Sequence, residues 1–94
     1  PWLGIYVAEN MENLFISGVT LKGPASIAGI NPGDILTAVN GQQIDSLPRL
    51  YKVLWSQGNA GIKLILTIIR EGTELDINVK SDSRYNFISK RQNH

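Results

Sequence analysis

Apolar runs, and stretches in which apolar and polar positions alternate, predict the strands of this chain. Residues 2–8 are apolar and β-prone, residues 15–21 alternate as a half-buried strand does, and a polar break at 9–13 separates them. A further strand is expected over residues 35–39. It ends at Asn40-Gly41, the strongest two-residue reversal signal in the sequence, so the chain should fold back there into another strand.

The last two expected strands form a hairpin. Residues 62–70 are almost continuously apolar, which is typical of a central strand. In the following stretch Leu75, Ile77 and Val79 alternate with polar residues, as in a strand that exposes one face to solvent. Glu71-Gly72 joins the two as a tight turn, so this hairpin is expected to close the domain.

Two helices are expected between the strands. Residues 24–28 begin with a proline, which the first helical turn tolerates, and end before Gly29, which favours the left-handed exit conformation. A turn at 31–34, "NPGD", follows it. A longer helix should begin after Ser46 as N-cap and run to about Gln57, with Gly58 as its exit.

The longer helix has a broad apolar face. Apolar residues follow the i, i+3, i+4, i+7 spacing, and two more widen the stripe. These positions are Leu47, Leu50, Tyr51 and Leu54, widened by Val53 and Trp55. Leu50 and Val53 are expected in the core, whereas the extra breadth indicates that the helix also borders another apolar surface.

The composition of the 94 residues describes one small globular domain, with 43% hydrophobic and 18% charged residues. A net charge of +1 argues against a dedicated phosphate-binding surface. The basic residues Lys80, Arg84, Lys90 and Arg91 collect near the end against the single acid Asp82. We therefore expect a domain over residues 1–80 and an irregular, solvated basic tail over residues 81–94. Pro1 is not a natural first residue, which suggests a domain excised from a longer chain.

The residue types offer no catalytic constellation. The single histidine, His94, is the last residue, where no carboxylate would hold it against a serine. The sequence has no cysteine, which removes disulfides, thiol catalysis and thiolate zinc sites. Asp34 follows a turn glycine and is expected to bond local backbone, while Glu71 and Glu74 should be solvated. We expect no catalytic residue, no metal and no cofactor in this chain.

Three stretches of the sequence form a recognisable set. They are "WLGI" at 2–5, "GPASIAGINPGDILTAVNGQQI" at 23–44 and "IKLILTIIREGTELDINV" at 62–79. Together they resemble the PDZ domain that accompanies bacterial trypsin-like serine proteases of the HtrA/Deg family. The resemblance covers about residues 1–80 and departs from the family at Gly23, where serine is usual. It implies an α+β, PDZ-like fold of the permuted bacterial type, with five to six strands in a partly open barrel or sandwich, one short helix and one longer helix.

This resemblance implies a peptide-binding module that receives the C-terminus, or an exposed hydrophobic segment, of another polypeptide by β-strand addition. Leu3, Gly4 and Ile5 would donate backbone N–H groups to the terminal carboxylate, because a glycine between apolar residues lets amides turn toward an anion. Residues 5–8 would pair with the ligand backbone, and the longer helix would form the other wall. The predicted peptide-binding residues are Trp2, Leu3, Gly4, Ile5, Tyr6, Val7, Leu47, Tyr51, Leu54 and Trp55.

The same resemblance implies ligand preferences and a parent protein. PDZ domains that prefer Ser or Thr third from the ligand's end carry histidine where Leu47 stands, so apolar side chains are expected at the last and third-from-last positions. The parent would be a serine endopeptidase with its protease domain upstream, periplasmic or membrane-anchored facing the periplasm.

Two alternatives remain open from the sequence. The first is a non-protease PDZ interaction module of a secretion or assembly complex. The second is a small β-barrel that binds nucleic acid through the basic tail, which steep salt dependence would reveal. Peptide docking into an apolar groove should change little with salt. We expect neither nucleic-acid binding nor membrane insertion by this segment.

Overall fold

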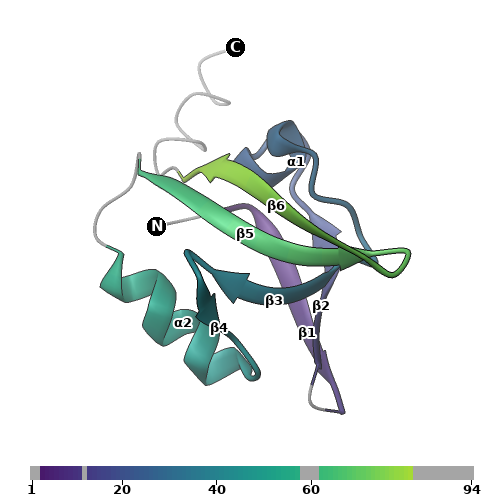
Figure 1. Cartoon of the computed structure of the whole chain (residues 1–94). Coiled ribbons are helices and arrows are strands. Elements are labelled where there is room, and N and C mark those ends of the chain that lie inside the picture. Colours follow the sequence, from purple (N-terminus) through teal and green to yellow (C-terminus); the bar gives the residue numbers. More distant parts are fainter. Residues whose placement is uncertain (1–2, 12, 58–61, 82–94) are drawn as a thin grey trace.

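The computed structural model of the chain describes residues 3–11, 13–57 and 62–81. Its elements follow one another as β1 (Ile5–Asn10), β2 (Asn13–Val19), α1 (Pro24–Ala28), β3 (Ile35–Val39), β4 (Gln42–Gln43), α2 (Leu47–Ser56), β5 (Lys63–Arg70) and β6 (Thr73–Lys80) (Figure 1). Trp2, the expected helix exit Gly58 and the expected tail from residue 82 onward lie outside the described residues.

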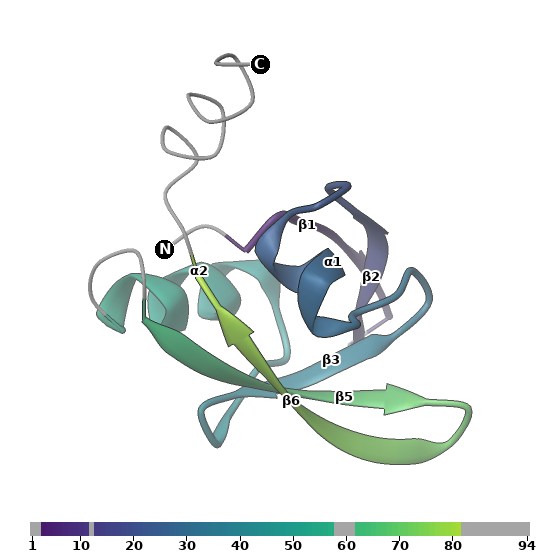
Figure 2. The ribbon, with the colours of Figure 1, turned by 90° about the horizontal axis from the view of Figure 1, so that it is seen from above.

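The described strands form one antiparallel sheet in the order β1-β2-β3-β5-β6, with β4 paired to β3. β1 and β6 stand at opposite ends of this order and do not pair with each other, so the sheet is not closed. Helices α1 and α2 lie well apart, as the two perpendicular views in Figures 1 and 2 agree. The predicted α+β class, with a partly open sheet and two helices, is therefore confirmed.

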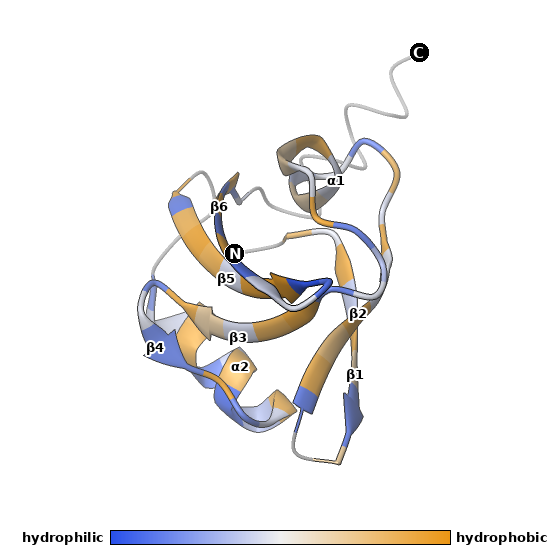
Figure 3. Ribbon diagram, turned by 45° about the vertical axis from the view of Figure 1, so that its right-hand side comes forward, coloured by the Kyte–Doolittle hydropathy of each residue, from blue (hydrophilic) through white to orange (hydrophobic). Residues whose placement is uncertain are grey.

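The core lies inside the curved sheet and against α2. Buried apolar side chains of the strands and of α2 meet there, namely Leu14, Ile16, Leu36, Val39, Leu50, Val53, Leu64, Leu66, Ile68 and Val79. Figure 3 shows the apolar colouring along β3 and β5, and the polar colouring of β4. Burial of Leu50 and Val53 confirms the expectation that they belong to the core.

β5 occupies the central place predicted from its apolar run, between β3 and β6. Its burial nevertheless alternates, because Leu64, Leu66 and Ile68 are buried whereas Lys63 is exposed and Ile65 is 43% exposed. Consecutive side chains of a strand point to opposite faces. The continuous run thus places only every second residue in the core.

β1 differs in its bounds from the predicted strand over 2–8. The strand begins at Ile5, because Gly4 has φ 70°, a left-handed value that turns the backbone before the ladder starts. It continues to Asn10, since the pairs Glu9 with Leu14 and Asn10 with Asn13 extend the ladder into the expected polar break. Polar side chains are tolerated there because this end of the hairpin is largely exposed.

The helices begin and end close to the start and stop signals predicted from the sequence. α1 spans the residues expected, Pro24–Ala28, and its C-cap is Gly29, whose φ is 97°. α2 begins after Ser46, whose Oγ accepts a hydrogen bond from the backbone N–H of Arg49 at 3.3 Å. α2 ends at Ser56, with Gln57 as its C-cap. The α2 bounds thus match the prediction to within one residue.

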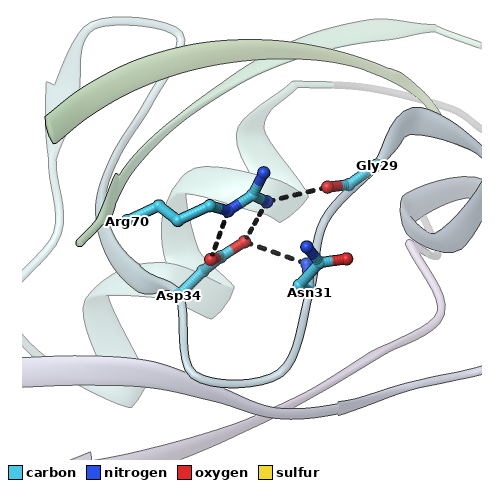
Figure 4. A network of polar contacts seen from close by, with 4 residues as sticks. All are labelled: Gly29, Asn31, Asp34 and Arg70. Carbon is cyan, nitrogen blue, oxygen red and sulfur yellow. Dashed lines mark hydrogen bonds and ion pairs between the residues drawn. The ribbon is translucent and has the colours of Figure 1, made fainter.

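Asp34 bonds local backbone as predicted, but it also has a distant partner. Its Oδ2 accepts from the backbone N–H of Asn31 at 2.9 Å. Arg70, at the end of β5, donates from Nε to Oδ1 at 2.9 Å and from Nη2 to Oδ2 at 2.7 Å (Figure 4). Nη2 of Arg70 also donates to the carbonyl of Gly29 at 2.8 Å. The bidentate pair ties the β5–β6 hairpin to the turn after α1.

The Asp34 carboxylate of this ion pair is buried. Asp34 is only 2% exposed, and its two oxygens receive three hydrogen bonds. The hydrogen bond from Arg70, assisted by the Asn31 amide and the nearby positive charge, lowers the pKa of Asp34 below its ordinary value despite the opposing effect of burial. Asp34 is therefore an ionised structural residue.

Candidate functional site

The loop before β1 is held through its carbonyl groups. The Leu3 carbonyl accepts from the Ala25 N–H at 2.9 Å, and the Gly4 carbonyl accepts from the Thr20 N–H at 2.8 Å. Leu3 is 3% exposed, so its side chain anchors the loop in the core. The N–H groups of Leu3 and Gly4 donate to no acceptor within the described residues. Among these residues, no acceptor competes for the two donors.

β1 is an edge strand with a free side. The Gly4 carbonyl points toward β2, and so does the Tyr6 carbonyl, which accepts from the Ser17 hydroxyl at 3.1 Å. Backbone groups of successive strand residues point alternately to either side. Ile5 and Val7 therefore direct their N–H and C=O groups away from β2, where the described chain has no further strand.

An apolar cleft of about 180 Å³ lies between this edge and α2. Its lining comes from the loop and β1 on one wall and from α2 on the other, namely Leu3, Gly4, Ile5, Val7, Leu50, Tyr51, Leu54 and Trp55. An apolar cavity of roughly 150 Å³ is large enough for benzene. The cleft is thus of a size for one branched or aromatic side chain.

Among the lining residues that the structure describes, none is acidic, basic or a histidine. An anion at the mouth of the cleft would be met by backbone N–H dipoles. The two aromatic residues at the rim remain largely in water, with Tyr51 56% exposed and Trp55 80% exposed. Exposed aromatic rings beside an apolar cleft are typical of recognition surfaces.

Nine of the ten predicted site residues are among those the structure describes, and seven of these nine line the cleft. Leu47 is half-buried and packs against the core outside the lining. Tyr6 is 63% exposed, on the opposite face of β1, where a Cβ placed on Gly18 would lie 3.4 Å from its ring. Trp2 lies outside the described residues. These placements leave Tyr6 with only its backbone near the open edge.

Sequence reasoning missed Leu50 as a lining residue. Leu50 was expected only in the core, and it is 2% exposed, yet it also forms part of the cleft wall. Its position between the core stripe and Tyr51 on the helical face is the signal that would have found it. A residue at the boundary of two apolar stripes contacts both surfaces.

A larger cleft of about 510 Å³ lies beside β3 and the start of α2. Charges of both signs, Asp45 and Arg49, stand on its rim. β3 is paired on both sides, with β2 and β4 on one and β5 on the other, so it offers no open strand edge. Of these two clefts, the smaller one adjoins the long edge strand β1 and the N–H groups of Leu3 and Gly4, which donate to no acceptor within the described residues.

The described part of the chain contains no group of three or more His, Cys, Asp or Glu side chains that could hold a metal ion. Among the same residues, no helix has the length and apolar character needed to cross a membrane.

A family model for the PDZ domain matches residues 1–81. The chain belongs to the PDZ domain family. The match spans the loop, β1, α2 and the closing hairpin, and it confirms the resemblance seen in the sequence.

Curated relatives of this PDZ domain include several serine proteases. A periplasmic serine protease of the do/HhoA-like type from Haemophilus influenzae is 38% identical over 69 residues, 73% of this chain and 15% of the relative. A CtpA-like serine protease from Staphylococcus saprophyticus is 35% identical over 80 residues, 85% of this chain and 16% of the relative. A Do-like HtrA serine protease from Lactobacillus helveticus is 32% identical over 75 residues, 79% of this chain and 18% of the relative. The chain thus spans less than a fifth of each of these relatives.

Solved structures share the fold of this PDZ domain. The HtrA-type protease AlgW with a decapeptide superposes with a TM-score of 0.76 at 21% identity, covering 88% of this chain and 29% of that one. The photosystem II D1 C-terminal processing protease gives a TM-score of 0.70 at 20% identity, over 84% of this chain and 22% of that one. At this level of identity the likeness establishes the fold.

Proposed function

We propose that this PDZ domain binds the extended C-terminus of another polypeptide, or an exposed hydrophobic segment, by strand addition to β1. One observation carries the proposal: the N–H groups of Leu3 and Gly4, which donate to no acceptor in the described part of the chain, adjoin the open edge of β1 and the apolar cleft. In β-strand addition, main-chain hydrogen bonds supply affinity and pockets for alternate side chains supply specificity. This structure offers both.

The arrangement predicts how the ligand lies. Its terminal carboxylate meets the N–H groups of Leu3, Gly4 and Ile5, and its last side chain enters the cleft between β1 and Leu54. The third-from-last side chain then faces Leu47, which has no hydrogen-bonding group for a Ser or Thr hydroxyl. Apolar residues are favoured at both ligand positions. A short peptide that must be ordered on binding should have a Kd of roughly 1 μM, which corresponds to a binding free energy of about −8 kcal/mol.

We further propose that the parent protein is a serine endopeptidase in which this domain regulates the protease or tethers substrate. The relatives named HtrA, do/HhoA-like and CtpA-like support this reading, as does the small share of their length that the chain spans. Two relatives, from Haemophilus influenzae and Chlamydia pneumoniae, are described as periplasmic. A periplasmic location, or a membrane anchor facing the periplasm, is therefore proposed for the parent.

A peptide titration tests the binding mode. Peptides ending in Val, Ile, Leu or Phe are added to the ¹⁵N-labelled domain while backbone amide shifts are recorded. We expect perturbations at residues 3–8 and 50–55, because those residues line the cleft or its open edge. Perturbations centred on Thr37, Ile44 and Arg49 would place the site in the larger cleft instead. Absence of any response to a broad library up to millimolar peptide would reject the proposal.

Amidation of the ligand's C-terminus tests the loop. Removing the carboxylate charge should weaken binding by about 10- to 100-fold, the range expected for hydrogen bonds to a charged group. The measurement is isothermal titration calorimetry of matched acid and amide peptides, at low and high salt. Equal affinities would show that internal segments, not chain ends, are recognised. A steep salt dependence would instead favour an electrostatic ligand.

A further inference from the structure

Asn40 joins three parts of the fold through one side chain. Its backbone N–H donates to the Ile65 carbonyl at 2.8 Å, and its Oδ1 accepts from the Ile65 N–H at 2.7 Å. Its Nδ2 donates to Oε1 of Gln57 at 2.8 Å. Asn40 also begins the reversal into β4, with φ 50°. The β3–β4 turn, β5 and the end of α2 are thereby connected.

Gln57 controls the last turn of α2. It is the C-cap of the helix, and its N–H donates to the Leu54 carbonyl at 3.2 Å. Its Nε2 also donates to the Ser56 hydroxyl at 3.3 Å. Leu54 and Trp55, two of the four cleft residues of α2, stand within this last turn. Any shift of Gln57 therefore moves one wall of the cleft.

We infer that Asn40 is a positioning residue for the peptide cleft. By holding Gln57 it keeps the last turn of α2, and with it Leu54 and Trp55, at the separation from β1 that a bound peptide requires. The inference rests on the proposed function, because it concerns the same cleft. Asn40 does not line that cleft and acts only through Gln57.

The chemistry of this position explains why asparagine serves there. The site needs an acceptor for the Ile65 N–H, a donor for Gln57 and a backbone that tolerates positive φ. The asparagine amide supplies both groups, and asparagine enters the left-handed region more readily than most side chains. Glycine would keep the backbone conformation and lose both side-chain contacts.

Asn40→Gly and Gln57→Ala test the connection from its two ends. Each should weaken peptide binding about three- to tenfold, the effect of one hydrogen bond of ordinary strength. The double variant should bind no more weakly than Asn40→Gly alone, because both changes remove the same contact. Gln42→Ala is the matched control, since Gln42 lies in the same reversal and its side chain has no hydrogen-bond partner within the described chain. Its affinity should equal that of the unaltered protein.

Variants that change the donor and acceptor groups of the Asn40–Gln57 hydrogen bond distinguish a positioning role of Asn40 from a general loss of stability. In Asn40→Asp, the Gln57 amide can rotate to donate to the new carboxylate. In Gln57→Glu, the new carboxylate accepts from the Asn40 amide. Either single variant should bind peptide within about twofold of the unaltered protein, whereas Asn40→Asp with Gln57→Glu has only acceptors and should bind as weakly as Asn40→Gly.

Two readouts are recorded at a temperature where every variant is fully folded: peptide affinity, and hydrogen exchange of the Leu54 and Trp55 amides without peptide. We expect faster exchange and weaker affinity together in Asn40→Gly and Gln57→Ala. Unchanged exchange, or faster exchange with unchanged affinity, overturns the inference. If the unaltered domain binds no peptide, the proposed function fails on that result. The positioning role for peptide falls with it, while the exchange data still decide whether Asn40 holds the helix.

Discussion

Replacing Asp34 with alanine is expected to lower the free energy of unfolding by about 2 kcal/mol, because hydrogen bonds to a charged group contribute about 1.5–3 kcal/mol. The change removes the acceptor of two hydrogen bonds from the Arg70 side chain and of one from the backbone N–H of Asn31. For a domain of this size the melting temperature should fall by about 10 °C. Urea and thermal unfolding followed by circular dichroism measure both quantities.

A double-mutant cycle controls this prediction. Arg70→Ala should also destabilise the domain, and the double variant should be less destabilised than the sum of the singles, because the two side chains share one contact. Arg70→Lys should not restore full stability, since an ammonium cannot reproduce the bidentate geometry and reach the Gly29 carbonyl as well. Strict additivity would show that the pair contributes no coupling of its own.

The same pair gives the stability a pH dependence. Because the pKa of Asp34 is lowered in the folded state, its stabilising contribution is complete above the unfolded carboxyl pKa of about 3.9 and is lost as pH falls through the folded value. The stability difference between the unaltered protein and Asp34→Asn should therefore be constant near neutral pH and shrink below about pH 4. Urea unfolding of both proteins from pH 7 down to pH 2.5 tests this. A difference that grows on acidification would contradict the assignment.

Replacing Gly4 with valine should abolish measurable peptide binding while most of the fold survives. Gly4 has φ 70°, which a β-branched side chain adopts only with strain of roughly 1–3 kcal/mol. Relief of that strain rotates the N–H groups of Gly4 and Ile5 away from the point where a carboxylate would sit, and the new side chain stands at the cleft. Calorimetric titration with a peptide that binds the unaltered domain is the measurement.

Gly33→Val is the matched control for Gly4→Val. Gly33 also has positive φ, at 96°, but lies in the turn before β3, where an added Cβ would meet no atom within 4 Å. This variant should carry a similar loss of stability and keep its peptide affinity. If Gly4→Val unfolds completely while Gly33→Val does not, Gly4 is structural. If Gly4→Val folds and binds normally, the loop is not the carboxylate site.

Local signals in the sequence predicted most of the fold because each element carries its own chemistry. Proline and glycine bracket α1, and Ser46 caps α2. Asn40-Gly41 and Glu71-Gly72 adopt positive φ at the two reversals, a conformation that asparagine and glycine favour and that glutamate adopts less readily. Strand bounds were less accurate. The predicted strand over 2–8 starts at Ile5 because the conformation of Gly4, not apolar character, decides where pairing begins.

The candidate site was predicted in part. Leu3, Gly4, Tyr51 and Leu54 lie where the family resemblance expected them, on two walls of one cleft. Tyr6 turns its ring to the opposite face because neighbouring residues of a strand alternate. Leu47 is half-buried against the core and lies outside the lining, whereas Leu50 is part of the lining, because the rotation of α2 about its axis depends on what the helix packs against.

By itself, the sequence determined the order and kind of the elements, the absence of cysteine and the family to which the chain belongs, since these follow from residue type and spacing along the chain. Only the tertiary structure decided that Arg70 pairs with Asp34 across 36 positions, and that Asn40 meets Gln57 at the end of α2. Neither contact leaves a local signal in the sequence, because each depends on how elements that are distant along the chain pack against one another. The open edge and the cleft belong to that second kind of information, and they carry the function proposed for this domain.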